Sequence, residues 1–390
     1  MSSSENMAIL PGLMRRWWLW AVLLAAGLAA WSYALPADAP RAWRAVLINF
    51  IYFCPLAAGM ALWPAIVTLA RGRWTGPYAP TAMAAVGFGP VSLATLAVLW
   101  RCWPQWATWS DPARQGLGFW LDPNFIFIRD LASLAVLWVL TLWFICARRR
   151  GGGGVSSVLA VVWFCLAFTL IAGDLVMGLD VHWYSTLFGG YFFMSALLTA
   201  VAGWALLTLW RMTELQRVRD MGNLVLAFSI LTTYMMFSQL LPIWFENLPQ
   251  EVRFVTVRMN PPWQLISVVL LATVYVGPLA LLIWRGVKWH RLPMMLVSLY
   301  VLAGTWIERW WEVTPTVGGR PVVGLAELGM ALAFISAMVL SMAVAARFLG
   351  PSSGCAARVA GVSPARFPTA GGGCATTAGG DCATGSEAKP

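Results

Sequence analysis

Long runs of apolar residues make up most of the chain, and the charged residues lie mainly in the short segments between them. A helix needs about 20 mostly apolar residues to cross the hydrocarbon core of a bilayer. Ten runs of about this length or longer occur, at 17–35, 43–70, 78–100, 125–147, 155–178, 186–210, 222–245, 263–285, 292–311 and 322–346. The pattern therefore predicts an all-α integral membrane protein with about ten transmembrane helices.

Three segments of the chain differ in character. Residues 17–349 contain all ten runs and are predicted to form the transmembrane domain, preceded by a cytoplasmic segment over 1–16. Residues 350–390 are rich in Gly, Ala, Ser, Thr and Pro, include three cysteines, and are expected to be a disordered cytoplasmic tail. The first run has no small-residue cleavage site and is long enough to span, so we expect no cleavable signal peptide.

The composition supports the same class. The chain is 60% hydrophobic and 11% charged, whereas soluble domains are about one quarter charged, which excludes a soluble globular enzyme. Only two histidines and seven cysteines occur, and they are scattered, so we expect no haem or iron–sulfur cluster in this chain.

The net charge of +10 follows from the predicted topology. With the N-terminus in the cytoplasm, the inner segments hold 17 of the 26 basic residues and carry +12, while the outer segments carry −1 and Glu327 lies inside a span. Such an excess of Arg and Lys is typical of cytoplasmic loops. It accounts for the charge without nucleic acid, which we do not expect as a partner.

Ionisable side chains within or beside the spans gather in the predicted outer half. Such groups are costly in a membrane and are candidates for function. The candidate functional residues are Arg129, Asp130, Asp174, Asp180, His182, Glu246 and Glu327, together with the polar Gln239. Two simpler interpretations stay open: Arg129 and Asp130 as a neutralised interfacial pair, and snorkelling of the group as a whole.

The seventh predicted span carries Ser229, Thr232, Thr233 and Gln239, whose spacing puts most of them on one helix face. Such a face either joins helices by hydrogen bonds or lines a hydrated path. Many tryptophans fall near predicted helix ends, as in the aromatic belts of membrane proteins: Trp17, Trp18, Trp100, Trp103, Trp183, Trp263, Trp289, Trp310 and Trp311.

A weak internal repeat relates the second and sixth spans. Tyr52-Phe53 precedes Arg71 much as Tyr191-Phe192 precedes Arg211, and both spans are predicted to run from outside to inside. This suggests a parallel duplication offset by four helices. We therefore expect two four-helix bundles, from helices 2–5 and 6–9, with flanking helices.

Four segments together resemble a known membrane family. They are 121–129, 174–193 with its His182-Trp183-Tyr-Ser-Thr sequence, 234–251 with Phe237-Ser-Gln239, and 306–315. The family is that of the polysulfide-reductase-type (NrfD-like) membrane subunits, and the similarity is greatest to the second, quinone-binding-type membrane subunit of alternative complex III. It covers roughly residues 15–350.

The resemblance implies a fold and a function. Such subunits have ten helices in two four-helix bundles and belong to quinol:cytochrome c oxidoreductase complexes of the bacterial inner membrane. The implied partners are membrane lipid, a homologous quinol-binding membrane subunit, an iron–sulfur subunit and multihaem cytochrome c subunits; the implied ligand is quinol or quinone. The sibling subunit is the better supported quinol site, and this one is suspected of forming a proton path.

Residue by residue, the resemblance places eight side chains at the family's recurring polar positions: Arg129, Asp174, His182, Ser185, Thr186, Ser238, Gln239 and Glu246. Asp180 stands where many relatives have Glu. Two other functions stay open from the residues themselves, a secondary transporter of the inner membrane and a purely structural membrane anchor. The absence of ionisable residues from the inner halves limits any proton path in this chain to its outer half.

Overall fold

The computed structural model describes residues 16–72, 78–108, 119–180 and 183–349. Over these residues the chain is 86% helical and has no β-strand, and nine helical segments are long and apolar enough to span a membrane. The one predicted span not among the nine is the ninth, 292–311, which corresponds to α15; that helix is of similar length but carries charged side chains near its end. The prediction of an all-α, multi-pass membrane protein is confirmed for the described residues. The predictions for 1–15 and 350–390 lie outside them.

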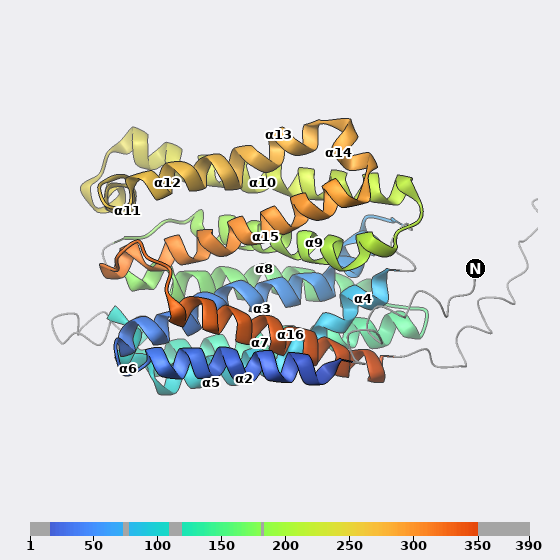
Figure 1. The fold of residues 1–390 in the computed structure, drawn as a ribbon, viewed down its shortest axis with the longest axis horizontal. Coiled ribbons are helices and arrows are strands. Elements are labelled where there is room, and N and C mark those ends of the chain that lie inside the picture. The colour runs from blue at the N-terminus through green and yellow to red at the C-terminus, as the bar shows by residue number, and fades with distance from the viewer. Residues whose placement is uncertain (1–15, 73–77, 109–118, 181–182, 350–390) are drawn as a thin grey trace, which may run out of the picture. The chain divides into compact units, whose positions relative to one another are not determined.

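The long helices follow the predicted runs closely, although α3 begins at Ala39 rather than 43 and α10 at Leu215 rather than 222. The helices are α2 (Trp17–Ala34), α3 (Ala39–Leu69), α4 (Ala79–Met83), α5 (Gly89–Arg101), α6 (Trp103–Trp106), α7 (Pro123–Arg149), α8 (Gly154–Leu175), α9 (Phe188–Thr208), α10 (Leu215–Glu246), α11 (Pro249–Met259), α12 (Gln264–Leu270), α13 (Gly277–Ile283), α14 (Arg285–Trp289), α15 (Arg291–Val313) and α16 (Leu325–Phe348). They lie roughly side by side, with α6 and α11 at one end and α4 and α14 at the other (Figure 1). We call these the α11 end and the α14 end.

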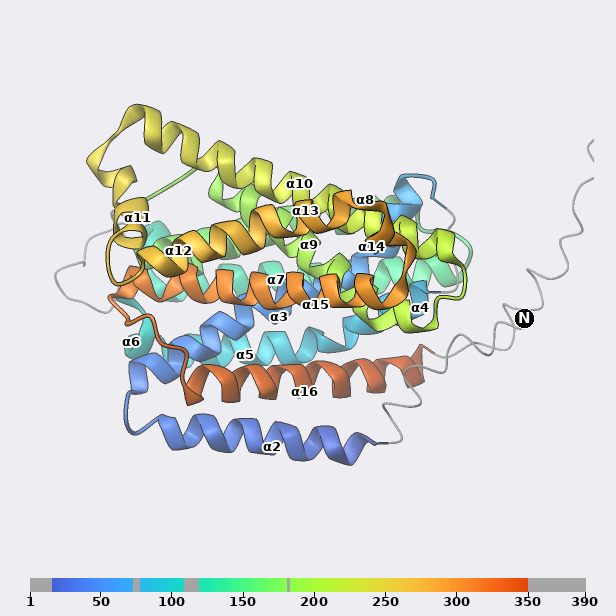
Figure 2. The same ribbon diagram turned by 45° about the horizontal axis from the view of Figure 1, so that its top comes forward.

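Helix α3 is the centre of the packing. Its apolar stretch is completely buried, and it contacts α5, α7 and α8 as well as α9, α15 and α16. The helices α5, α7 and α8 also pack in sequence against one another, and α9, α10, α13 and α15 form a second set of mutual contacts. Helix α2 packs almost entirely on α16, away from the other helices (Figure 2).

Close packing between α2 and α16 depends on glycine. A Cβ atom on Gly27 would lie 2.5 Å from the carbonyl oxygen of Gly329, so a larger residue there would force the helices apart. Small residues are the usual means by which membrane helices approach closely.

Prolines lie inside two of the long helices, Pro55 and Pro64 in α3 and Pro242 in α10. A further break lies between α12 and α13, where residues Leu271–Val276 form a π-helical segment just before Pro278. Proline has no N–H and clashes with the carbonyl four residues earlier, which explains why the regular helix is interrupted there.

Neighbouring side chains bond to the carbonyl groups of the π segment. The hydroxyl of Tyr300 donates to the carbonyl of Thr273 at 2.6 Å, and that of Thr233 approaches the carbonyl of Tyr275 at 3.4 Å. Gly277 makes this possible, because a Cβ there would lie 2.2 Å from the Tyr300 hydroxyl. Such substitute donors are how interrupted membrane helices keep their backbone satisfied.

Candidate functional site

Six polar side chains form one hydrogen-bonded network between α9, α15 and the π segment, towards the α11 end. We call this network the glutamate site; its members are Tyr191, Ser195, Tyr275, Glu308, Arg309 and Glu312. None of the six is more than 4% exposed. Ionised side chains removed from water cost several kcal/mol each unless they are paired, so a buried network of this size is a candidate for function.

Glu308 is the best-coordinated member. One carboxylate oxygen, Oε1, accepts a hydrogen bond from the Tyr191 hydroxyl at 2.5 Å and another from the Tyr275 hydroxyl. The other, Oε2, accepts from the Ser195 hydroxyl at 2.9 Å and from Arg309 Nη2 at 3.0 Å. The carboxylate is therefore held by four donor groups and is fully buried.

Arg309 and Tyr191 join Glu308 to the second carboxylate. Arg309 Nη1 donates to Glu312 Oε2 at 2.8 Å, and its Nη2 donates to the Ser195 hydroxyl at 2.6 Å. The Tyr191 hydroxyl lies 3.0 Å from Glu312 Oε1 as well as 2.5 Å from Glu308. Because this hydroxyl has only one proton, it serves one carboxylate at a time and links the two.

Helix geometry places these groups together. Tyr191 and Ser195 are four residues apart on α9, as Glu308 and Glu312 are on α15, so each pair shares a helix face. Tyr275 reaches the site from the π segment, where its hydroxyl lies 3.0 Å from that of Tyr191. Single-turn π segments often occur at functional sites, and here the segment carries a hydroxyl that bonds to Glu308.

Arg258 lies beside the site on the short helix α11, outside the predicted spans. Its Nη2 donates to the main-chain carbonyl of Glu312 at 2.6 Å and to the Thr316 hydroxyl at 2.7 Å, and its guanidinium stacks on the Phe254 ring. Burial lowers the pKa of Arg258, while the nearby charge of Glu312 acts in the opposite direction. Since guanidinium groups stay protonated in proteins, Arg258 supplies a second cation next to two carboxylates.

A smaller cluster lies between α7 and α8, also towards the α11 end. We call it the aspartate site; its members are Arg129, Asp130 and Asp174. Arg129 Nη2 and Asp174 Oδ2 are 2.5 Å apart, and the guanidinium lies over the Trp120 ring. Thus Arg129 forms an ion pair with Asp174 rather than with its chain neighbour Asp130, contrary to the interfacial-pair interpretation.

Asp130 is fully buried yet poorly satisfied. Neither of its carboxylate oxygens accepts a hydrogen bond within the described residues, although it interacts electrostatically with Asp174 and Arg129. Two nitrogen atoms of Arg129 are likewise buried without a hydrogen-bond partner there. The aspartate site therefore has hydrogen-bonding capacity that the described side chains do not use.

The other predicted site residues are dispersed. Asp180 forms an ion pair with Arg253 of α11 at 3.2 Å, and Glu327 pairs with Arg41 at 2.7 Å and accepts from the backbone N–H of Gly324, at the start of α16. Glu246 is exposed at the end of α10. His182 lies outside the described residues.

Gln239 is buried on the inward face of α10, as are Ser229 and Thr232. The predicted polar face is therefore turned into the protein. The carbonyl oxygen of Gln239 and the hydroxyl of Thr232 have no hydrogen-bond partner among the described residues.

The aromatic-belt interpretation is wrong for four tryptophans. Trp183, Trp263, Trp310 and Trp311 are all buried, at 4% exposed or less. Trp183 stacks on Phe254 with ring centroids 4.1 Å apart, and Trp311 donates its indole N–H to Ser267 at 2.8 Å. These rings pack around α11 and the end of α15, because folding brings those elements together over the α11 end of the helices.

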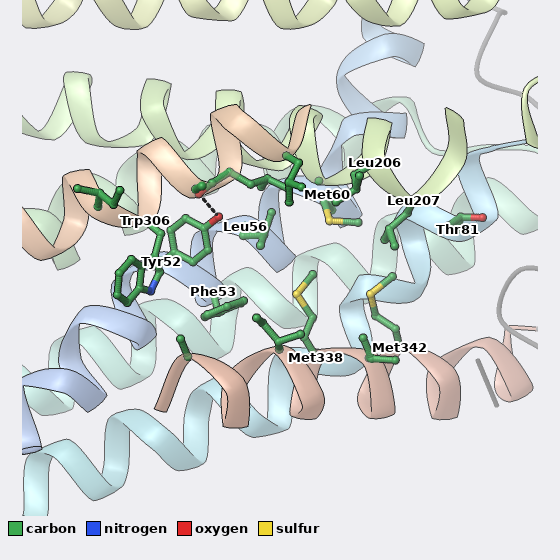
Figure 3. Close-up of a pocket in the computed structure, with 18 of the residues that line it drawn as sticks. Tyr52, Phe53, Leu56, Met60, Thr81, Leu206, Leu207, Trp306, Met338 and Met342 are labelled. Atoms are coloured by element: carbon green, nitrogen blue, oxygen red, sulfur yellow. Dashed lines mark hydrogen bonds between the residues drawn. The ribbon is translucent and has the colours of Figure 1, made fainter. Parts of the chain in front are cut away.

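An apolar cleft of about 470 Å³ lies between α3, α9, α15 and α16 (Figure 3). Tyr52, Phe53 and Met60 of α3 line its floor, and Met338 and Met342 of α16 line one wall. The volume is within the range of small-molecule sites, roughly 300–1,000 Å³.

The residues predicted from the sequence include none of the six members of the glutamate site: Tyr191, Ser195, Tyr275, Glu308, Arg309 and Glu312. One signal was available: Glu308 and Glu312 are four residues apart, with Arg309 between them, at the end of an apolar run. The tyrosines gave none, because a tyrosine within an apolar run is equally typical of a helix interface.

No group of three or more His, Cys, Asp or Glu suited to a metal ion occurs in the described part of the chain. Comparison with the models of known protein families and with curated proteins gives no match. The site is therefore interpreted from its own geometry.

Proposed function

We propose that this chain is an integral membrane subunit of a quinol-oxidising respiratory complex, of the alternative complex III type, in the bacterial inner membrane. In this function it contributes to quinol binding and to an outer-half proton path. Its partners are a homologous quinol-binding membrane subunit, an iron–sulfur subunit and multihaem cytochrome c subunits. The observation that carries the proposal is the glutamate site, a buried and continuous network of carboxylates and hydroxyls.

The chemistry of quinol oxidation requires such groups. It releases protons as well as electrons, so it needs proton acceptors and hydrogen-bonding groups near the point of release. Two carboxylates joined by tyrosine hydroxyls can take up and pass on a proton without opening the site to water. Beyond the end of α15, Arg258 bonds to the main-chain carbonyl of Glu312 and to the hydroxyl of Thr316, so polar groups continue past the second carboxylate.

The position of the site also supports the proposal. Basic residues concentrate at the α14 end, where α3, α7 and α16 finish and α10 and α15 begin. By the positive-inside rule, that end of the helices is the cytoplasmic one. The glutamate and aspartate sites then lie towards the outer face, where external electron-transfer subunits dock.

The two sets of packed helices agree with a family of two four-helix bundles. One set is α3, α5, α7 and α8, and the other is α9, α10, α12–α13 and α15, with α2 and α16 as flanking helices. Each set contains one of the two carboxylate sites. This arrangement supports the proposed relation to the NrfD-like subunits.

Affinity purification of the tagged full chain from membranes tests the proposal. We expect multihaem cytochrome and iron–sulfur subunits to copurify, and a chain that purifies alone would contradict the complex. Uptake of an ion or solute into vesicles containing only this protein would favour a transporter instead.

Site variants separate an active subunit from a structural anchor. In the assembled complex, Glu308→Gln is expected to lower quinol oxidation by about a hundredfold, the lower range for loss of an acid–base group. Arg217→Ala, which removes an exposed ion pair with Glu214, is the control and should leave turnover unchanged. Full activity of an assembled Glu308→Gln complex would indicate an anchor.

A further inference from the structure

We infer that the apolar cleft between α3, α9, α15 and α16 binds an isoprenoid quinone, with its tail along α16 and its ring beside Tyr52. This inference rests on the proposed function and adds to it a binding site on this chain. No candidate residue from the sequence lies in the cleft. Three observations support the inference: the residues that line the cleft, the side on which the cleft opens, and a second, smaller cavity next to Tyr52.

The lining suits a hydrocarbon chain. Apart from the hydroxyl of Thr81 near the α14 end, the polar side-chain atoms that line it are already bonded elsewhere. The Tyr52 hydroxyl donates to the carbonyl of Leu302 at 2.8 Å (Figure 3), and the Trp306 indole N–H donates to the side-chain carbonyl of Asn49 at 3.0 Å. A charged head group inside the cleft would be left without partners, at a cost of several kcal/mol.

The cleft opens to the side of the protein that faces lipid. Ile307 and Leu299 on one rim, and Leu328 and Ile335 on the other, are between 40% and 58% exposed. Lining residues on α16 extend from Leu328 to Met342, which at 1.5 Å per residue is about 21 Å. A long tail can therefore enter sideways from the bilayer and lie parallel to the helices.

A second cavity lies between the cleft and the glutamate site, sharing Tyr52 with the first and Arg309 with the second. It is only about 10 Å³, close to the minimum that holds one water molecule, and Tyr52 lines it together with Thr199 and Arg309. Ile51 and Pro55 also line it, and Pro55 has no N–H to donate to the carbonyl of Ile51. A water bound there would have the carbonyl of Ile51, the hydroxyl of Thr199 and the guanidinium of Arg309 as its neighbouring polar groups.

The head group that fits the part of the cleft beside Tyr52 is small and neutral. A tyrosine hydroxyl that donates one hydrogen bond can still accept another, so Tyr52 can bind a quinol hydroxyl while keeping its bond to Leu302. Only Tyr52 and one water-sized cavity then separate the ring from Arg309. A phospholipid could place an acyl chain in the cleft, but its phosphate would have to remain outside.

Photolabelling tests the inference on the full chain alone, in nanodiscs. An azidoquinone with a decyl tail should label residues of α3, α9, α15 and α16, and unlabelled decyl quinone should compete. Ala303→Phe and Ala331→Phe fill the cleft from opposite walls and should each reduce labelling by about tenfold, equivalent to about 1.4 kcal/mol of binding free energy.

Matched controls place the same side chain on the lipid-facing surface of the same helices. Leu296→Phe on α15 and Val344→Phe on α16 should label like the parent chain. Tyr52→Phe removes only a hydroxyl and should weaken labelling while the elution profile stays unchanged, which separates loss of binding from loss of folding.

Two outcomes would overturn the inference: labelling that the Phe variants do not reduce, and protection by phospholipid but not by decyl quinone. Because the assay contains no partner subunit, it is independent of copurification. Labelling without copurifying subunits would refute the proposed complex but support the quinone site. Copurifying subunits without labelling would support the complex but refute the quinone site.

Discussion

The glutamate site and the aspartate site have similar ingredients but differ in how completely they are satisfied. Each combines two buried carboxyl groups with an arginine towards the α11 end of the helices. In the glutamate site, donors surround Glu308 and Arg309 bridges it to Glu312. In the aspartate site, Arg129 holds Asp174, and Asp130 accepts no hydrogen bond from a described residue.

The difference follows from what each arginine can reach. Arg309 is followed one turn later by Glu312, and Arg258 adds a second positive charge, so two cations face two carboxylates. Arg129 is the only cation within hydrogen-bonding distance of the Asp130–Asp174 pair among the described residues. A network whose polar groups are all hydrogen-bonded is rigid and costly to break. The stability of a network with unbonded groups depends on further hydrogen-bond partners, such as a water or a ligand.

The largest expected effect is the loss of the bridging arginine. Arg309→Ala leaves two buried carboxylates without their shared cation and should lower the free energy of unfolding by about 3–5 kcal/mol. Chemical unfolding in detergent measures this. Arg129→Ala should cost less, since its site already contains an unsatisfied carboxyl group, and Arg217→Ala at the surface should cost about 0–1 kcal/mol. If Arg309→Ala and Arg129→Ala lower the free energy of unfolding equally, the two sites do not differ in how strongly their arginine stabilises the protein.

Loss of a single hydroxyl tests whether the network transfers protons. Tyr275→Phe breaks one link to Glu308 and should lower quinol oxidation by the assembled complex by about tenfold, with a stability cost of about 1 kcal/mol. Tyr300→Phe is the matched control, because that hydroxyl bonds to the π segment and not to the carboxylates. If both variants lose activity equally, the π segment matters only for packing.

Replacing one carboxyl group by an amide should change the free energy of unfolding in opposite directions in the two sites. Asp130→Asn should leave the free energy of unfolding unchanged or raise it by about 1 kcal/mol, because the buried carboxyl group that it replaces accepts no hydrogen bond from a described residue. Glu312→Gln should lower it by about 1–3 kcal/mol, since Arg309 loses its partner. Thermal unfolding of the two variants side by side decides this. Destabilisation by Asp130→Asn would mean that Asp130 has an essential partner.

The smallest effect is expected at a residue in neither site. Glu246 is exposed at the end of α10, so Glu246→Gln should change the free energy of unfolding by less than about 0.5 kcal/mol and leave quinol oxidation unchanged. A loss of activity with normal stability would show that this end of α10 contacts a partner subunit.

The helices were largely predictable, because span length and apolar content are local properties of the chain. The shared polar face of α10 was also correctly predicted, since Ser229, Thr232 and Gln239 are all buried on it. The π segment was not anticipated, since it depends on Pro278 together with substitute donors from α10 and α15. The four buried tryptophans looked like interfacial residues until α11 and α15 were placed around them.

The sequence by itself determined the class of protein, the number of long helices and the end at which polar residues gather, because bilayer thickness and charge distribution act along the chain. Only the tertiary structure decided which polar residues meet. Tyr191, Tyr275 and Glu308 are separated by long stretches of sequence and are joined because α9, the π segment and α15 pack together. A pairing between buried charges depends on distances of a few ångströms between helices, which no local pattern encodes.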